Sequence, residues 1–124
     1  MASLFPLPSV RARTEKSDDK SSGETVILEV AVLNVRPAMA RDFESAFVTA
    51  SAIISAMPGY ISHQLQRCVE IPDRYLLLVN WVTLEAHTVG FRGSPEYQQW
   101  RQLLHHFYDP FPTVEHYVSL EGAR

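Results

Sequence analysis

The sequence predicts a single α+β domain in which strands and helices follow the order βαββαβ. Two stretches, one in each half of the chain, have apolar residues at helical spacing. Two strand-like runs adjoin each other in the middle of the chain across a short Pro72–Asp73 turn. Further strand-like runs begin and end the domain. These observations together favour a sheet of four strands with two helices.

Length and composition limit the class of protein. A chain of 124 residues accommodates one domain with a modest core, and its net charge of -3 argues against a nucleic-acid surface. The one cysteine, Cys68, excludes an internal disulfide framework. No apolar run approaches the roughly 18 residues of a membrane span. Pro6 and Pro8 interrupt the apolar patch at the amino terminus, so no signal peptide is predicted. We expect a cytoplasmic protein that binds neither nucleic acid nor membrane.

The domain is predicted to occupy residues 25–120. Residues 1–24 are predicted to be a disordered tail, because from Ser9 onward they mix charges with Ser and Gly and show no hydrophobic periodicity. Residues 121–124 are predicted to be a short C-terminal tail.

The first strand is predicted at residues 25–34, which are rich in β-branched side chains. Its one charge, Glu29, shares a face with Ile27, Ala31 and Leu33. The opposite face is uniformly apolar and consists of Val26, Leu28, Val30 and Val32. Two largely apolar faces indicate that both are covered, one by helices and one by something else.

The first helix is predicted at residues 37–57. Pro37 suits the first helical position, and Pro58–Gly59 ends the helix. Its apolar residues step by three or four and form one stripe: Met39, Phe43, Ala46, Phe47, Ala50, Ile54 and Met57. This stripe is expected to lie on the sheet.

A hairpin is predicted next, with strands at residues 60–70 and 75–82. The first alternates in steps of two, with Ile61 and His63 on one face and Tyr60 on the other. The second begins with an uncharged run and extends to Trp81 and Val82, which is typical of a central strand covered on both faces.

After this strand the chain turns polar. Thr83 and Glu85 suit a helix start, and Gly90, Gly93 and Ser94–Pro95 break that helix and start another. The second long helix is predicted at residues 94–108 and the last strand at 113–120. Apolar residues gather on one side of this helix: Tyr97, Trp100, Leu103, Leu104, Phe107 and Tyr108.

The element order is that of the split βαβ, ferredoxin-like arrangement, with an antiparallel sheet and both helices on one face. The sheet face without helices would expose too large an apolar patch for a monomer. We therefore predict a homodimer whose sheets pack face to face and close a barrel-like core, a dimeric α+β barrel.

This order resembles the antibiotic biosynthesis monooxygenase family, which belongs to the dimeric α+β barrel group. The resemblance covers residues 25–120 and is carried by four segments: Met57-Pro58-Gly59-Tyr60, the Trp81 strand, Leu84-Glu85-Ala86 and Ser94-Pro95-Glu96-Tyr97. The family includes cofactor-free monooxygenases that oxidise phenolic or quinol substrates, haem-degrading enzymes, and members of unknown activity.

The resemblance argues against haem degradation. The haem-degrading branch needs an Asn on the first strand and a Trp and a His in the second helical region. At the matching positions this chain has Ala31, Phe91 and Arg101, and Asn34 is offset by three residues.

The resemblance implies a site near Trp81 for a flat aromatic compound. Such a site needs aromatic walls, a few polar groups and a base, for which His87 is the candidate catalytic residue. The other candidate substrate-binding residues are Trp81, Phe91, Trp100 and Tyr108 as walls and Asn80, Arg92 and His63 as polar contacts. Neither a metal-ligand spacing nor a phosphate or dinucleotide loop is present, so we predict no metal and no bound cofactor.

Several of these residues have a second interpretation. Trp81 and Trp100 are also suited to a plain core. His63 is suited to a hydrogen bond at the interface, and Glu115–His116 to a contact with a group of the partner chain.

Two functions stay open: a cofactor-independent monooxygenase acting on a small phenol or quinol, and a non-catalytic dimeric module that binds small molecules or serves a stress response. Substituting His87 by Ala separates them, because only the enzyme has turnover to lose.

Overall fold

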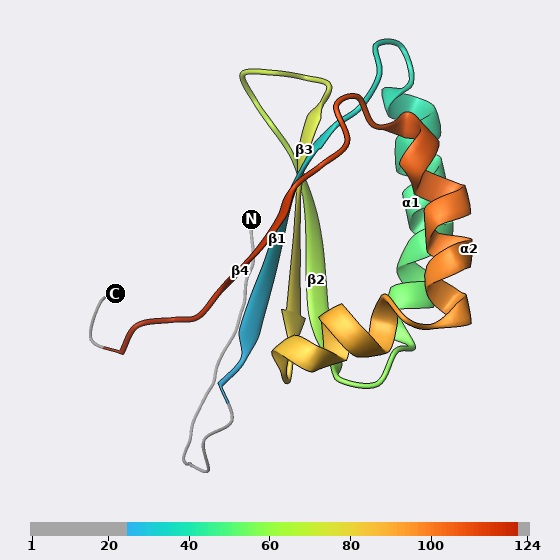
Figure 1. The fold of residues 1–124 in the computed structure, drawn as a ribbon. Helices are drawn as coiled ribbons and strands as arrows, with labels where there is room; N and C mark the ends of the chain where they lie inside the picture. The colour runs from blue at the N-terminus through green and yellow to red at the C-terminus, as the bar shows by residue number, and fades with distance from the viewer. Residues whose placement is uncertain (1–24, 122–124) are drawn as a thin grey trace.

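The structure is a computed structural model that describes residues 25–121. The elements follow the predicted βαββαβ order (Figure 1). They are β1 (Ile27–Asn34), α1 (Ala40–Ser55), β2 (Tyr60–Arg67), β3 (Arg74–Trp81), the π-helical turn η2 (Ala86–Phe91), α2 (Pro95–Leu104), the 3-10 turn η3 (His105–Phe107) and β4 (Val114–Tyr117). The predicted tail at 1–24 and all but the first residue of the predicted tail at 121–124 lie outside the described residues.

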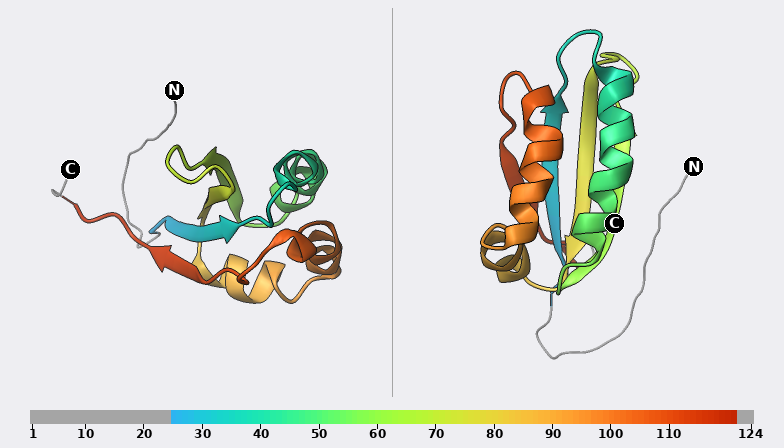
Figure 2. Two further views of the ribbon diagram at one scale, coloured as in Figure 1. Left: turned by 90° about the horizontal axis from the view of Figure 1, so that it is seen from above. Right: turned by 90° about the vertical axis from the view of Figure 1, so that its right-hand side faces the viewer.

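The four strands form one antiparallel sheet in the order β2-β3-β1-β4. The central position of β3 confirms the prediction made from its apolar run. Helices α1 and α2 stand side by side on one face of this sheet, and η2 lies at the foot of α2, where β3 ends (Figures 1 and 2). The fold is thus the predicted ferredoxin-like arrangement, with both helices on one face.

The start of the first helix differs from the prediction. Helix α1 begins at Ala40 rather than at Pro37. Ala38 has a φ of 68°, a left-handed conformation that no residue of a right-handed helix adopts. The N–H of Met39 donates to the carbonyl of Arg36 at 3.1 Å, which closes a turn ahead of the helix. Pro37 therefore belongs to that turn, and its predicted helical position is wrong.

The second long helix is shorter than predicted. It begins at Pro95 because the Ser94 side chain caps it, accepting a hydrogen bond from the Tyr97 N–H at 3.2 Å. It ends at Leu104 and continues as η3. Tyr108 has left the helix because its backbone pairs with Val35. The last strand is likewise shorter than the predicted 113–120.

A β-bulge changes which residues of β2 face the helices. Between Tyr60 and Ser62 the register against β3 shifts, so Tyr60 lies opposite Trp81 and His63 lies opposite Val79. Trp81 and Val79 both face the helices, and so do Tyr60 and His63. The prediction that Tyr60 and His63 lie on opposite faces is wrong, because one extra residue reverses the alternation.

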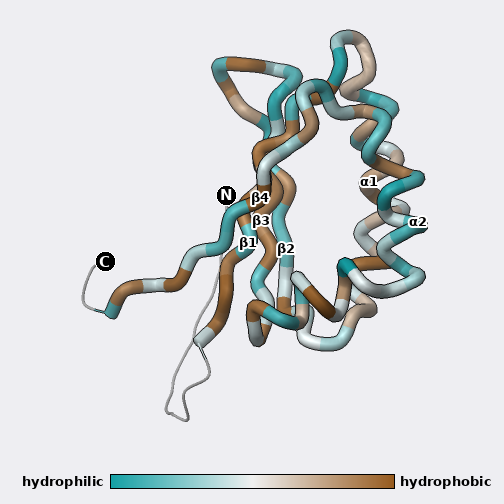
Figure 3. The backbone as a smooth tube through the Cα atoms, in the orientation of Figure 1, coloured by the Kyte–Doolittle hydropathy of each residue, from teal (hydrophilic) through white to brown (hydrophobic). Residues whose placement is uncertain are grey.

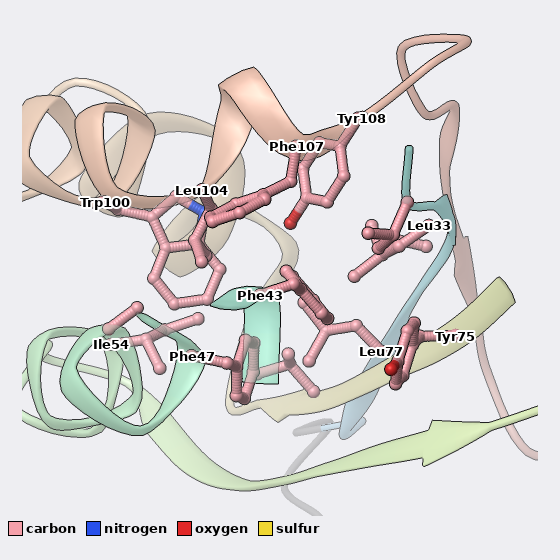
Figure 4. Close-up of a cluster of buried hydrophobic side chains, with 14 of the residues drawn as sticks. Leu33, Phe43, Phe47, Ile54, Tyr75, Leu77, Trp100, Leu104, Phe107 and Tyr108 are labelled. Carbon is pink, nitrogen blue, oxygen red and sulfur yellow. The ribbon is translucent and has the colours of Figure 1, made fainter. Parts of the chain in front are cut away.

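The hydrophobic core lies between the sheet and the helices (Figure 4). The predicted stripe of α1 is confirmed, since Phe43, Phe47, Ala50 and Ile54 are all buried. Phe43 packs against Tyr75 of β3 at a ring-centroid distance of 4.9 Å. From α2 and η3, Trp100, Leu104 and Phe107 complete this layer.

The other face of the sheet is apolar along its centre. Figure 3 shows apolar residues along β1 and β3. On this face Leu28, Val30, Leu76 and Leu78 are half-buried, and Val32 is 41% exposed. Nothing within residues 25–121 packs over them as a second layer (Figure 2). Among the helices of the described range, none is long and apolar enough to cross a membrane.

Candidate functional site

The candidate site is built around the indole of Trp81 at the end of β3. This side chain has no exposed surface. Its ring stacks on that of His87 at 5.4 Å and an interplanar angle of 21°, and Tyr60 meets it edge-on at 6.3 Å. The indole N–H points to the neighbouring strand and donates to Glu29 Oε1 at 2.9 Å. The indole is therefore held by ring contacts with His87 and Tyr60 and by the hydrogen bond of its N–H.

Glu29 is a buried carboxyl group on the central strand β1. Only 5% of the residue is exposed, because it points into the layer between sheet and helices. Burial raises the pKa of Glu29, while the hydrogen bond from Trp81 and the charge of Arg92 act in the opposite direction. A carboxyl group in this position accepts a proton more readily than an exposed glutamate does.

Turn η2 brings His87 to this carboxyl group. Ahead of this turn, Thr83 Oγ1 accepts a hydrogen bond from the Ala86 N–H at 3.0 Å. The turn packs closely on Gly59, which has a φ of 86° and where a Cβ would lie 2.5 Å from the Cβ of Ala86. The Pro-Gly sequence after α1 therefore does more than end a helix: it makes room for the turn that carries His87.

Both ring nitrogens of His87 lie beside protein atoms. Nε2 lies 3.4 Å from Glu29 Oε1, and Nδ1 lies 2.8 Å from Nε2 of His116 on β4. Burial, then the charges of Arg92 and His116, lower the pKa of His87 to about 3. At neutral pH the ring is uncharged. Because both of its nitrogens face protein atoms, this ring can exchange a proton with a ligand only through a neighbouring side chain.

His116 stands between this buried group and the surface. It lies directly across from Glu29 in the β1–β4 ladder and is half-buried. Burial and the charge of Arg92 lower the pKa of His116 as well. Arg92 itself is exposed, just after η2. We refer to Glu29, Trp81, His87 and His116 as the carboxylate–imidazole centre.

The structure brings some of the predicted site residues together and separates others. Phe91 lies beside Trp81 with ring centroids 5.9 Å apart, and Trp100 lies behind Phe91 at 5.5 Å. Tyr108 belongs to the other end of the core, where it packs on Phe43.

Two polar candidates lie away from His87. Asn80 is on the opposite face of the sheet and donates to the Ser62 hydroxyl at 3.1 Å. His63 is near the β2 edge, where its Nδ1 lies 2.6 Å from the Tyr60 hydroxyl and its ring packs on Phe47. The expected pairing of His63 with an interface partner is replaced here by a contact within the chain.

Sequence reasoning did not assign Glu29 and His116 to the site. A signal for Glu29 was present, since a single carboxyl group on an otherwise apolar strand face must find a buried partner. No comparable signal marks His116, whose role depends on pairing between the first and last strands. Within residues 25–121, His, Cys, Asp and Glu side chains form no group of three or more arranged to hold a metal ion.

A comparison with known families decides the relationship. The family model described as Antibiotic biosynthesis monooxygenase matches residues 26–103. The chain belongs to this family.

Similar proteins of the antibiotic biosynthesis monooxygenase family or fold occur in several bacteria. The uncharacterized protein YczJ of Bacillus subtilis (strain 168) is 55% identical over 95 residues, covering 77% of this chain and 100% of YczJ. A crystal structure from Bordetella bronchiseptica that bears the family name is 33% identical, covers 78% of this chain and 99% of that one, and has a TM-score of 0.75. SnoaB of Streptomyces nogalater, a cofactor-independent oxygenase, shares the fold at 21% identity, with coverage of 81% and 96% and a TM-score of 0.62.

Proposed function

We propose that this protein is a cofactor-independent monooxygenase that acts on a small phenol or quinol. The observation that carries the proposal is the carboxylate–imidazole centre, a buried proton-accepting group placed beside an indole in a fold of this family. An oxygenase without a cofactor needs a group of this kind, because its substrate must lose a proton before it can reduce oxygen.

The reaction places few demands on the protein. An ionised phenol donates an electron to oxygen, so the substrate is its own reductant. For a phenol with hydrogen at the para carbon, one oxygen atom becomes the second carbonyl of a quinone. The other oxygen atom combines with the two hydrogens that the substrate loses and leaves as water. The protein has to bind the ring, take up the hydroxyl proton and keep bulk water away from the intermediates.

The centre meets the proton-accepting requirement. His87 is uncharged at neutral pH because its pKa is lowered to about 3. The adjacent Glu29 has a raised pKa and therefore gains a proton readily. The exposed guanidinium of Arg92 supplies the positive charge that a phenolate requires. In this proposal Phe91 and Trp81, both buried, pack against the ring of His87 and hold it in place, and His87 belongs to the proton-accepting group.

Oxygen uptake tests the proposal. The protein is incubated with a panel of quinols and anthrones under air and under nitrogen, and oxygen consumption and quinone absorbance are recorded. We expect oxygen-dependent turnover that His87→Ala lowers about 100-fold, the effect typical of losing general base catalysis, while substrate binding persists. His106→Ala, which alters an exposed histidine, serves as the matched control. Absence of turnover above background with every substrate contradicts the proposal.

A non-catalytic small-molecule-binding module is the alternative. The observation that favours it is the burial of the central side chains, since Trp81 is 0% and His87 3% exposed. In such a module the centre would serve binding alone. Retained ligand binding with no oxygen uptake in the unmodified protein selects this alternative.

We propose further that a second copy of the chain covers the open face of the sheet. Proteins of this family are typically dimeric. The half-buried residues of this face, Leu28, Val30, Leu76 and Leu78, form a continuous apolar strip on the two central strands. Gln64 and Gln66 on β2 and Glu115 on β4 border it with polar groups. An apolar centre with a polar rim is the usual composition of a protein–protein interface.

Sedimentation tests the dimer. We expect twice the 14.1 kDa of one chain at micromolar concentration. Val30→Glu places a charge at the centre of the proposed interface and should give monomers. Val48→Glu, on an exposed position of α1, should leave the mass unchanged. A stable monomer of the unmodified protein contradicts this proposal and leaves the assignment of the centre untouched.

A further inference from the structure

His116, on the last strand, lies where a ligand can meet the buried centre. It is half-buried, whereas His87 and Glu29 behind it are 3% and 5% exposed. Its Nε2 lies 2.8 Å from His87 Nδ1. Among residues 25–121 its Nδ1 has no hydrogen-bond partner. We propose that His116 takes the hydroxyl proton of the ligand and passes it through His87 to Glu29. The ligand of this relay is the phenol of the proposed function, and in that respect the relay rests on the proposed function.

The order of the relay follows from which nitrogens are occupied. His87 uses Nε2 toward Glu29 and Nδ1 toward His116, so its ring bridges the two and offers no third nitrogen. His116 uses one nitrogen toward His87 and keeps the other. We assign the proton of His87 to Nε2 and that of His116 to Nε2, since each then points at an acceptor.

Three proton shifts complete the transfer. The O–H bond of the ligand breaks and His116 Nδ1 gains the proton. The Nε2 proton of His116 moves to Nδ1 of His87, and the Nε2 proton of His87 moves to Oε1 of Glu29. Both imidazoles end uncharged in their other tautomer, Glu29 ends as a carboxylic acid, and the ligand ends as an anion. Nothing is oxidised or reduced in these steps.

Burial of the three groups favours this direction. Burial raises the pKa of Glu29 and lowers the pKa values of both histidines, which shifts the preference for the proton toward the carboxyl group and away from the rings. The positive charge of Arg92 lowers the pKa of all three groups, so it opposes proton uptake by Glu29 as well as by the rings, and burial acts against it at Glu29. On β4 itself, Glu115 lies on the other face of the sheet, where it accepts a hydrogen bond from the Tyr117 hydroxyl.

The ligand class follows from the end state. Negative charge leaves the core and appears on the ligand, beside the exposed guanidinium of Arg92. This suits a small planar compound with an acidic aromatic hydroxyl, bound as its anion. A neutral aromatic without an ionisable hydroxyl has no proton to give and gains nothing from the relay. Arg92 is thus expected to favour ligands that bind as anions. His116 is the residue that touches the hydroxyl oxygen of the ligand.

The test uses 4-nitrophenol, whose ionised form absorbs visible light, with the full chain. Absorbance reports whether bound probe is ionised, and difference infrared spectroscopy reports whether a buried carboxylic acid forms at the same time. In the unmodified protein below neutral pH we expect bound phenolate together with a new carboxylic-acid band. Glu29→Gln should remove the band, and His116→Phe should remove both the band and the ionisation of bound probe. Turnover of any accepted phenol should fall about 100-fold in His116→Phe.

Controls separate this inference from the proposed function. His106→Phe makes the same substitution at an exposed histidine and should behave as the unmodified protein. Near-ultraviolet circular dichroism checks that His116→Phe is folded, and Glu29→Gln tests the relay with His116 in place. Phenolate formation with the infrared band but without oxygen uptake supports the relay and overturns the oxygenase. Oxygen uptake that His116→Phe leaves unchanged, or no ionised probe in the unmodified protein, overturns the relay.

Discussion

The layer between sheet and helices has two ends that are built from the same strands but differ in chemistry. At one end β1 and β3 contribute Leu33 and Tyr75 to an aromatic core with Phe43, Phe107 and Tyr108 (Figure 4). At the other end the same two strands contribute Glu29 and Trp81 to the carboxylate–imidazole centre. Both ends are buried, yet only one contains a carboxyl group.

Each end has a glutamate that accepts a hydrogen bond from an aromatic side chain, but the two glutamates differ in exposure. In the aromatic core the Tyr75 hydroxyl donates to Glu44, whose side chain remains 47% exposed at the edge of α1. In the carboxylate–imidazole centre the Trp81 N–H donates to a glutamate that is inside the protein. A buried carboxyl group costs free energy that a hydrophobic side chain would not. The aromatic core is therefore explained by stability, and the centre requires another explanation, for which we propose proton transfer.

The largest effect is expected in the aromatic core. Phe43→Ala removes a ring with no exposed surface that packs on four other aromatic rings. We expect the free energy of unfolding to fall by about 3–5 kcal/mol, from lost burial and the cavity left behind. Urea unfolding measures it. Val48→Ala on the exposed side of α1 should change the value by less than about 0.5 kcal/mol, and a small loss in Phe43→Ala would show that this end is not the main source of stability.

A smaller loss is expected when the centre loses its hydrogen-bond donor. Trp81→Phe removes part of a buried ring and leaves the carboxyl group of Glu29 without the indole N–H. We expect a loss of about 2–4 kcal/mol in the free energy of unfolding. Trp100→Phe is the matched control, because it removes the same atoms from a buried indole that is not bonded to a carboxyl group. Equal losses in the two variants would mean that the hydrogen bond to Glu29 contributes little.

The pH dependence of stability distinguishes the centre from the aromatic core. His87 has a lowered pKa in the folded protein, so below its ordinary value of 6.5 the unfolded chain binds a proton that the folded chain does not. Stability from this group is therefore lost as pH falls from about 6.5 toward 3. Between pH 6.5 and 5 we expect a loss of about 1.5 kcal/mol, which His87→Gln should not show.

Glu29 acts with the opposite sign in part of this range. Its folded pKa is raised, so its contribution favours the folded state more as pH falls through that value toward 4.5. Measuring His87→Gln against the unmodified protein, with Glu29 present in both, isolates the histidine. Parallel pH curves for the two proteins would contradict the assignment of His87 as a buried, uncharged ring.

The smallest effect is expected from the hydroxyl group at the edge of the aromatic core. Tyr75→Phe keeps the buried ring and loses only the hydrogen bond to Glu44. Because Glu44 is half-exposed, water replaces the lost donor, and we expect a loss of about 0.5–1 kcal/mol in the free energy of unfolding. Thermal unfolding at neutral pH measures it. A loss as large as that of Trp81→Phe would remove the contrast between an exposed and a buried glutamate.

Local patterns were sufficient to predict most of the fold. The stripe of α1, the central position of β3 and the start of a helix at Ser94–Pro95 depend on neighbours a few residues away, and the structure confirms all three. Errors arose where one residue changes the pattern. Ala38 adopts a left-handed conformation that delays α1, and the bulge beside Tyr60 reverses the faces of β2.

The sequence by itself determined the order of elements, the apolar faces and the presence of Trp81 and His87 near the end of the central strand, because hydrophobic periodicity and capping are local. Tertiary structure alone decided that Glu29, His87 and His116 meet. Their contact depends on the register between the first and last strands and on a turn that fits against Gly59. Such pairings are set by the packing of distant segments, and no spacing along the chain encodes them.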